Sequence, residues 1–305
     1  MIIPQSVESI GEQAFKYCRK FNGLTISEGV KSIGEEAFSD CYGFTGTLTI
    51  PQSVESIDYR TFYGCSGFNG LTISEGVKSI GEQAFYECSG FTGTLTIPQS
   101  VESIGSYAFK GCAGFTELIL LEGLKSITGF CGCTGFTGSL TIPEGVPSIG
   151  PAAFSGCTGF TGTLTIPQSV ASIGHSAFSG CTGFTELILP DGLKTIELCT
   201  FDGCSGFTGP LTIPQSVESI GNYAFRYCRG FTGSLTIPEG VTSIGNSAFY
   251  GCTGFTGSLT IPTSVTTIGN QAFFKCTGLS TVKIPKSTKL GDHCFLGCTA
   301  EIIYY

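Results

Sequence analysis

The chain repeats one short pattern of apolar and polar positions from end to end. A Leu-Thr-Ile triplet, such as residues 48–50, puts two apolar side chains on one side and a polar one on the other. This alternation is typical of a half-buried strand. The proline that follows, Pro51, has no N–H to donate and ends the pairing. Because Val54 and Ile57 then supply a second apolar pair, each repeat is predicted to bury two sides.

A glycine follows the second apolar pair and marks a turn. In the segment Ser-Ile-Gly-Glu-Gln-Ala-Phe, Gly81 leads into a stretch that is too brief for a standing helix, so we expect a short helical or irregular segment. A Thr-Gly return then brings the chain to the next strand. The return is one residue longer in some repeats (45–47) than in others (69–70). We expect this extra residue to adjust a loop and to leave the buried positions unchanged.

Cysteine and phenylalanine fix the period. Thirteen of the sixteen cysteines form a ladder with spacings of 23 or 24 residues, except 21 before Cys133 and 22 before Cys298. Thirteen phenylalanines lie three residues before a ladder cysteine and eleven lie three residues after one, while Leu279 takes the twelfth place and Phe274 is left over. Phenylalanine is costly to expose, so we expect two internal stacks. Such a period predicts a solenoid whose coils bury their apolar sides against each other. The ladder consists of Cys18, Cys41, Cys65, Cys88, Cys112, Cys133, Cys157, Cys181, Cys204, Cys228, Cys252, Cys276 and Cys298.

Net charge and the length of apolar runs limit the kinds of partner that the chain is expected to bind. The 305 residues include 15 Lys and Arg against 23 Asp and Glu, which gives a net charge of -8. Nucleic acid is not expected as a partner, because phosphate-rich surfaces demand a basic face. No apolar run approaches the roughly 18 residues of a membrane span, so no membrane insertion is expected. The first ten residues lack the basic start and apolar centre of a signal peptide. The first residues also correspond to the middle of a repeat.

The repeat resembles the leucine-rich repeats of the BspA type, a class of bacterial and protist surface proteins. One repeat matches the pattern of that class at nine positions, which are Leu95, Ile97, Pro98, Val101, Ile104, Gly105, Ala108, Phe109 and Cys112. The resemblance covers essentially the whole chain. It departs from the class in the return segment, where phenylalanine replaces the usual leucine.

The resemblance implies a fold and a cellular location. The expected fold is an α/β-type repeat solenoid, a curved right-handed leucine-rich-repeat horseshoe or rod with a parallel β-sheet on its concave face. About 13 coils would form a single domain over 1–305, with a C-terminal capping unit at 277–305. Proteins of this class are described as adhesins. We therefore expect an extracellular or cell-surface location and an extracellular protein or glycan as ligand.

The candidate site is the row of side chains that point outward from the concave sheet. Most middle positions of the triplets are threonine, whereas two repeats place isoleucine there and glutamate two residues earlier. Few charges lie nearby, since 126–193 holds no lysine or arginine. We expect the acidic and apolar spots to form the centre of a binding surface. The candidate residues are Thr49, Thr72, Thr96, Glu117, Ile119, Thr141, Thr165, Glu186, Ile188, Thr212, Thr236 and Thr260.

The cysteine ladder has three interpretations: a disulfide framework, a metal array, or a buried stack of free thiols. Stacked side chains of parallel coils point the same way, and thirteen members cannot pair completely, so the buried thiol stack is favoured. The off-ladder Cys131, Cys199 and Cys294 lie where repeats depart from the consensus. With only His175 and His293 as additional ligands, far apart in coil number, no metal site and no cofactor are expected.

Several classes of function stay open. Threonine suits an exposed strand simply because it is β-branched and polar, and regularly spaced hydroxyls can also meet glycans, peptides or ice. The favoured function is a non-catalytic adhesion and recognition module. The alternatives are a structural protein that self-associates head to tail or edge to edge, and, more remotely, an ice-binding protein. An enzyme is the least supported class, because no nucleophile, base and orienting group converge.

Overall fold

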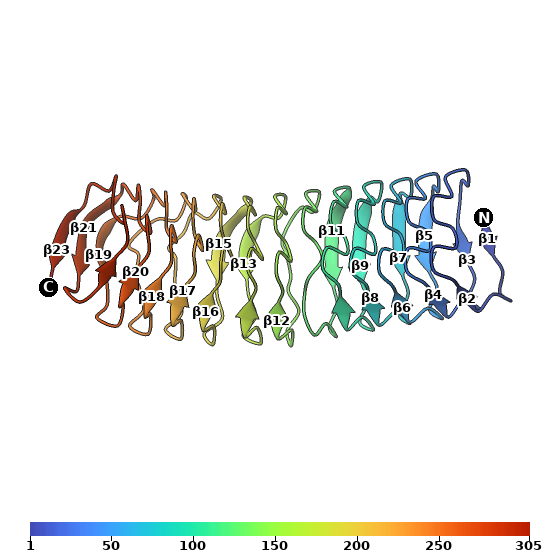
Figure 1. Ribbon diagram of the computed structural model, residues 1–305, viewed down its shortest axis with the longest axis horizontal. Helices are drawn as coiled ribbons and strands as arrows, with labels where there is room; N and C mark the ends of the chain where they lie inside the picture. Colours follow the sequence, from blue (N-terminus) through green and yellow to red (C-terminus); the bar gives the residue numbers. More distant parts are fainter. The chain divides into compact units, whose positions relative to one another are not determined.

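The computed structural model describes all of residues 1–305, and the backbone forms β-strands and turns without any helix. Its contacts divide into two compact units. Unit 1 is Met1–Val146 with Ala152–Gly159, and unit 2 is Pro147–Pro151 with Phe160–Tyr305. In each unit, successive coils lie side by side as a parallel β-solenoid (Figure 1). The single domain with a capping unit, the horseshoe curvature and the right-handed sense stay predictions.

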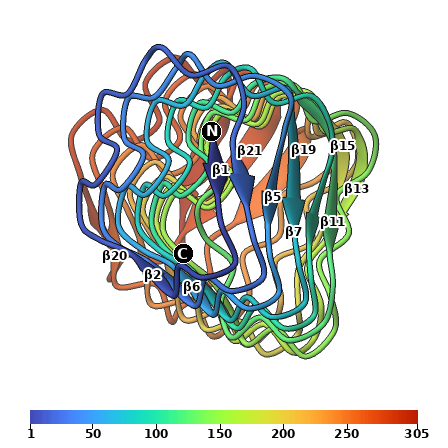
Figure 2. The same ribbon diagram turned by 90° about the vertical axis from the view of Figure 1, so that its right-hand side faces the viewer.

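Each coil contributes strands at two places. The strands formed around the Leu-Thr-Ile triplets are here called return strands, and those formed by Ser-Ile pairs are called Ser–Ile strands. Figure 2 shows the return strands β5, β7 and β11 of unit 1 on one side and the Ser–Ile strands β2 and β6 at another. The Ser–Ile strands were missed by the sequence reading, which expected only a buried pair there. The signal was present, because a buried isoleucine follows serine or threonine in nearly every coil.

Unit 1 holds eleven strands, and every pairing in it is parallel. The return strands are β1 (Ile2–Ile3), β3 (Thr25–Ile26), β5 (Thr47–Ile50), β7 (Gly70–Ile73), β9 (Gly93–Ile97) and β11 (Phe115–Leu120). The Ser–Ile strands are β2 (Ser9–Ile10), β4 (Ser32–Ile33), β6 (Ser56–Ile57), β8 (Ser79–Ile80) and β10 (Ser103–Ile104). The Ser–Ile strands form one five-stranded sheet, while the return strands pair only two by two.

Unit 2 repeats this arrangement. Its return strands are β13 (Gly162–Thr165), β15 (Phe184–Ile188), β19 (Gly257–Thr260), β21 (Leu279–Ile284) and β23 (Glu301–Tyr304). Its Ser–Ile strands, or their equivalents, are β12 (Ser148–Ile149), β14 (Ser172–Ile173), β16 (Thr195–Ile196), β17 (Ser219–Ile220), β18 (Ser243–Ile244), β20 (Thr267–Ile268) and β22 (Lys289–Leu290). The last five of these form a continuous sheet, whereas two return segments, 211–213 and 235–237, form no strand.

The absence of helix has a backbone cause. In the segment after Gly81, alternate amides bond within the coil and to the next coil: Ala84 N–H donates to the Gly81 carbonyl, but Phe85 N–H donates to the Ala108 carbonyl. Gln83 and Glu87 both adopt left-handed φ of 56°, which a continuous right-handed helix excludes. The α/β assignment is therefore not confirmed, and the expected helical or irregular segment is a series of turns.

The buried interior follows the sequence pattern. Within unit 1, Phe38 and Phe62 stack with ring centroids 5.3 Å apart and planes 1° apart. The second stack meets the first edge-on, as in Phe38 against Phe44 at 6.1 Å. Eleven of the thirteen ladder cysteines are buried, and only the terminal Cys18 and Cys298 are partly exposed. The two aromatic stacks and the buried cysteine stack are thus confirmed within the units.

The length of the return decides which return strands pair. A short return has three residue steps from the second phenylalanine position to the strand leucine, as in Phe115 to Leu118, and a long return has four, as in Phe91 to Leu95. Each short-return strand pairs with the strand of the coil before it. These pairs are β1–β3, β5–β7, β9–β11, β13–β15 and β19–β21.

Long returns break the sheet. β5 and β9 do not pair with β3 and β7, and the segment before β19 meets the preceding coil only through an isolated bridge between Phe255 and Gly233. Most long returns contain a left-handed glycine, such as Gly46 with φ of 83°, which bends the chain directly before β5. The extra residue does leave the buried positions unchanged, as expected, but it also stops the hydrogen bonding between strands.

Candidate functional site

The twelve candidate residues all lie exposed on the outer side of the return segments, which we call the strand surface. Pairing places Thr49 beside Thr72, and Thr96 beside Ile119, in unit 1. In unit 2 it places Thr165 beside Ile188. The outward direction of these residues follows from strand alternation, since the flanking leucines and isoleucines are buried. Their role in binding stays a prediction.

Two sets of threonines differ in what their hydroxyls do. The threonine directly after the second phenylalanine bonds to the coil before it, as Thr92 Oγ1 donates to the Asn69 carbonyl at 2.9 Å. Thr137 Oγ1 likewise donates to the Thr116 carbonyl at 3.1 Å. The threonines in the middle of the strands, such as Thr49 and Thr96, make no such bond. The first set is engaged in this way in six coils, whereas the middle threonines offer free hydroxyls to a ligand or to water.

The acidic and apolar spot of unit 1 lies beside a hollow. Glu117 accepts a hydrogen bond at 2.7 Å from Thr94 Oγ1 of the preceding coil. Two residues on, Ile119 is 38% exposed. A hollow of about 490 Å³ opens between β11 and residues 137–141 of the next coil, and Glu117, Ile119 and Thr141 all line it. The hollow occurs where a long return follows a short one, so the pairing of strands has stopped.

Unit 2 repeats the local arrangement at β15. Thr163 Oγ1 donates to Glu186 at 2.8 Å, and Ile188 is 44% exposed. β15 is also the last strand of its two-stranded sheet. Ile119 belongs to unit 1 and Ile188 to unit 2, so each unit carries one spot of this chemistry.

The ladder cysteines are free thiols engaged with the backbone. Cys65 Sγ donates to the Phe38 carbonyl at 3.0 Å, and Cys88 Sγ donates to the Phe62 carbonyl at 3.0 Å. Burial raises the pKa of these thiols well above the usual range. The ladder is therefore an internal element that holds neighbouring coils together rather than a reactive site.

The off-ladder cysteines are less uniform. Cys131 and Cys199 are partly exposed, and Cys294 is buried. Burial raises the pKa of Cys294 to about 12, while hydrogen bonding from the Phe273 and Ala272 backbone opposes that rise. His175 and His293 are exposed. No group of three or more His, Cys, Asp or Glu side chains is placed to hold a metal ion.

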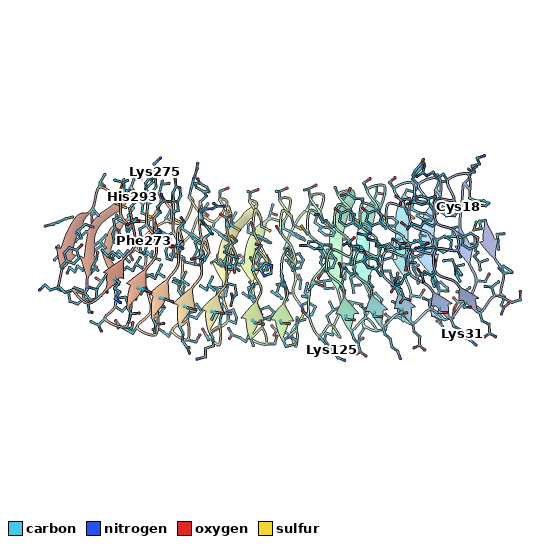
Figure 3. All side chains as sticks on the ribbon, viewed as in Figure 1. Cys18, Lys31, Lys125, Phe273, Lys275 and His293 are labelled. Atoms are coloured by element: carbon cyan, nitrogen blue, oxygen red, sulfur yellow. The ribbon has the colours of Figure 1, made fainter.

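The sequence reading missed an aromatic and cationic group on the turn edge, the series of turns between each Ser–Ile strand and its ladder cysteine. Phe274, left over from the two stacks, lies there against Tyr250, with ring centroids 4.8 Å apart and planes 13° apart. Figure 3 shows Lys275 and His293 at this edge and Phe273 inside the coil. In unit 1, Tyr63 and Tyr86 stack similarly at 5.0 Å. The signal was an aromatic residue directly after the first phenylalanine of a coil.

Comparisons with known proteins agree with this architecture. The family model described as the BspA type leucine-rich repeat region matches residues 1–112, 45–161, 128–228 and 206–305. A solved leucine-rich repeat protein from Bacteroides ovatus is 29% identical, with a TM-score of 0.71 over 98% of this chain and 84% of that one. A search of the curated proteins gives no match. The structure has no helix that is long and apolar enough to cross a membrane.

Two further solved structures are similar. A leucine-rich cell surface protein from Faecalibacterium prausnitzii is 25% identical, with a TM-score of 0.53 over 92% of this chain and 77% of that one. The pneumococcal vaccine antigen PcpA, at 19% identity and a TM-score of 0.60 over 100% of this chain and 78% of that one, is similar in fold alone. Because the family model matches in overlapping segments from residue 1 to residue 305, over coils that stack as described, the chain belongs to the BspA-type leucine-rich repeat family.

Proposed function

We propose that this chain is a non-catalytic recognition module of a surface protein, and that it binds its ligand through the strand surface. The observation that carries the proposal is the hollow beside β11, where exposed Ile119 adjoins Glu117. Apolar surface rimmed by polar groups is typical of an interaction site, and here Ile119 lies in the hollow with Glu117, which is already oriented by Thr94. A partner would gain an apolar contact and a fixed acceptor at the same place.

The ligand is an extracellular protein or glycan of a host or of a neighbouring cell. The strand surface has few charges, so it would hold a partner through contact area more than through long-range attraction. Free threonine hydroxyls around Ile119 supply hydrogen bonds without the cost of burying ions. Membership of the family supports an interaction role, and the similar protein from F. prausnitzii, described as a cell surface protein, supports the location.

Lysine substitution on the strand surface tests the proposal. Ile119→Lys, Ile188→Lys and the double variant place a charge in each spot, and we expect the double variant to bind at least tenfold more weakly. Leu198→Lys is the matched control, because Leu198 lies outside the strand surface and is as exposed as Ile188, at 44%. Binding would be measured by interferometry against a panel of extracellular matrix proteins and glycans. Unchanged binding of the double variant to every ligand in the panel would refute the proposal.

A further inference from the structure

The turn edge of unit 2 presents a continuous row of aromatic rings over three consecutive coils. Tyr227 meets Tyr250 at 5.2 Å between ring centroids with planes 82° apart, and Tyr250 stacks on Phe274 at 4.8 Å. Tyr227 is 37% exposed, and the other two rings are half-buried. These rings lie outside the two internal stacks. The row therefore presents partly exposed aromatic rings at the surface, outside the internal stacks.

Cations flank the row, and two of them have no acidic partner. Arg226 is held by Asp202 through hydrogen bonds of 2.8 and 2.6 Å. Arg229 lies over the Tyr227 ring at 5.0 Å and Lys275 lies over the Phe274 ring at 5.4 Å, and neither forms an ion pair. In a chain of net charge -8, two unpaired cations beside exposed rings form a place that attracts anions.

A hollow lies between these two cations. Its volume is about 270 Å³, and it is lined by Tyr227, Arg229, Tyr250, Gly251, Thr253 and Lys275. Known ligand pockets start at roughly 300 Å³, so this hollow suits one ring-sized group and not a large ligand. Gly251 contributes to the space, because a Cβ there would lie 3.0 Å from the Tyr227 ring.

Two left-handed positions beside the hollow carry large side chains instead of glycine. The position before the ladder cysteine is left-handed throughout unit 2 and is glycine in four of its six coils. The other two residues are Tyr227 and Lys275, with φ of 60° and 57°. Both side chains line the hollow, so two large side chains stand at its edge where most coils of unit 2 have glycine.

The turn edge offers no main-chain partners to a peptide. Tyr227 N–H donates to the Tyr250 carbonyl, Gly251 N–H to the Phe274 carbonyl, and Lys275 N–H to the Leu296 carbonyl. With these amides used between coils, an extended peptide cannot add as a strand. Recognition here must come from side chains alone, that is, from aromatic faces, cationic tips and the hydroxyls of Tyr250 and Thr253.

We propose that this hollow binds an acidic sugar residue of a glycan, with its ring against Tyr250 and its carboxylate or sulfate between Arg229 and Lys275. The C–H face of a sugar ring is apolar and packs on an aromatic face. A carboxylate or sulfate accepts charge-assisted hydrogen bonds from guanidinium and ammonium groups. This site is independent of the strand surface and of the function proposed for it.

Binding of defined oligosaccharides to the full chain tests the proposal. The probes are a chondroitin sulfate oligosaccharide, a hyaluronan oligosaccharide of equal length, a neutral chitin oligosaccharide and an oligoglutamate peptide. We expect the chain to bind one or both acidic oligosaccharides, and to bind the chitin oligosaccharide and the oligoglutamate peptide at least tenfold more weakly. Equal binding of the peptide would overturn the assignment to a sugar, and equal binding of the chitin oligosaccharide would overturn the role of the cations.

Variants locate the binding on the molecule. Arg229→Gln with Lys275→Gln is expected to weaken binding of the acidic oligosaccharide at least tenfold, and Tyr250→Ser at least fivefold. The matched control is Lys286→Gln with Lys289→Gln, which removes the same charge from exposed positions of unit 2 outside the hollow and is expected to stay within twofold. Thermal unfolding would verify that each variant is folded. Equal weakening by both double variants would show attraction by net charge alone, and the proposal would fail.

Discussion

The Ser–Ile strands and the return strands of unit 1 belong to the same coils, yet one set forms a continuous sheet and the other does not. Five Ser–Ile strands pair in the order β10-β8-β6-β4-β2, whereas the return strands form the separate pairs β1-β3, β5-β7 and β11-β9. Both sets alternate buried and exposed residues. They differ in the loop that precedes them, because the return varies in length. Variation in the repeat is therefore concentrated on the side that carries the strand surface.

The segment from each ladder cysteine to the second phenylalanine position behaves like the Ser–Ile strands, because neighbouring coils are in close contact there. A glycine precedes the second phenylalanine position in nearly every coil after the first, and a Cβ there would meet a carbonyl oxygen of the preceding coil at 2.0 to 2.3 Å. The ladder thiols bond to carbonyls across the same spacing. An inserted residue would disrupt these contacts, and this segment keeps the same length in every coil from that of Cys18 to that of Cys276.

Alkaline pH is expected to have the largest effect on the free energy of unfolding, because it acts on the buried ladder cysteines. Burial raises the pKa of Cys41 to about 11 and that of Cys112 further. Below the ordinary thiol pKa of about 8.5, the thiols are protonated in both states. Above it, unfolded chains lose protons that the folded ladder keeps, so the free energy of unfolding falls as the pH rises. Each thiol contributes about 1.4 kcal/mol per pH unit to this fall.

Urea unfolding at pH 7.5, 9 and 10 would measure the fall. Cys112→Ala removes one titrating thiol, so its free energy of unfolding should fall less steeply above pH 8.5, by about 1.4 kcal/mol per pH unit. A free energy that stays constant between pH 7.5 and 10 would show that the buried ladder is not retained in solution.

Two glycines three residues apart in one coil compare the two sides directly. The Cβ of Gly206→Ala would lie 2.1 Å from the Thr182 carbonyl oxygen, whereas Gly209 in the return has no neighbouring atom within 4 Å. Because backbone oxygens cannot easily move aside, we expect Gly206→Ala to lower the free energy of unfolding by about 3 kcal/mol. Gly209→Ala should change it by about 0.5 kcal/mol or less. Equal losses in urea unfolding would contradict the difference between the sides.

Much of the fold could be predicted from sequence, because the period of the repeat is also its physical unit. Phe62 and Cys65 recur at fixed phases, and burial in a stack is the only common environment that satisfies them. The sequence could not decide in this way between a short helix and irregular turns in the segment that follows each Ser–Ile strand. Left-handed residues such as Gln83 and Tyr223 donate backbone hydrogen bonds to the next coil, and no local propensity of glutamine or tyrosine indicates this conformation.

The candidate sites were predictable to different degrees. Strand alternation alone placed Ile119 and Thr96 outward. The hollow beside Ile119 depends on two successive returns of different length, so it emerges only when neighbouring coils are compared. The row on the turn edge was hidden because Tyr250 and Phe274 follow directly after residues of the internal stack. In sequence they look like part of that stack.

Changing the length of one return is expected to move the break in the sheet. Deleting Gly138 shortens the return between Phe136 and Leu140, so β11 should pair with residues 139–141 and the hollow should close. Inserting a glycine between Thr116 and Glu117 should do the opposite and separate β11 from β9. Each change alters only a few exposed hydrogen bonds. We therefore expect the deletion to raise the free energy of unfolding by about 1 kcal/mol and the insertion to lower it by about 1 kcal/mol.

Amide hydrogen exchange would detect these changes residue by residue. The deletion should slow exchange in 140–141, and the insertion should speed exchange in 117–119, while the Ser–Ile amides of the same coils keep their rates. If exchange around β11 stayed the same in both variants, return length would not be the cause of the break. If the deletion slowed exchange and also abolished ligand binding, the same extra residue that interrupts the sheet would be what opens the strand surface to a partner.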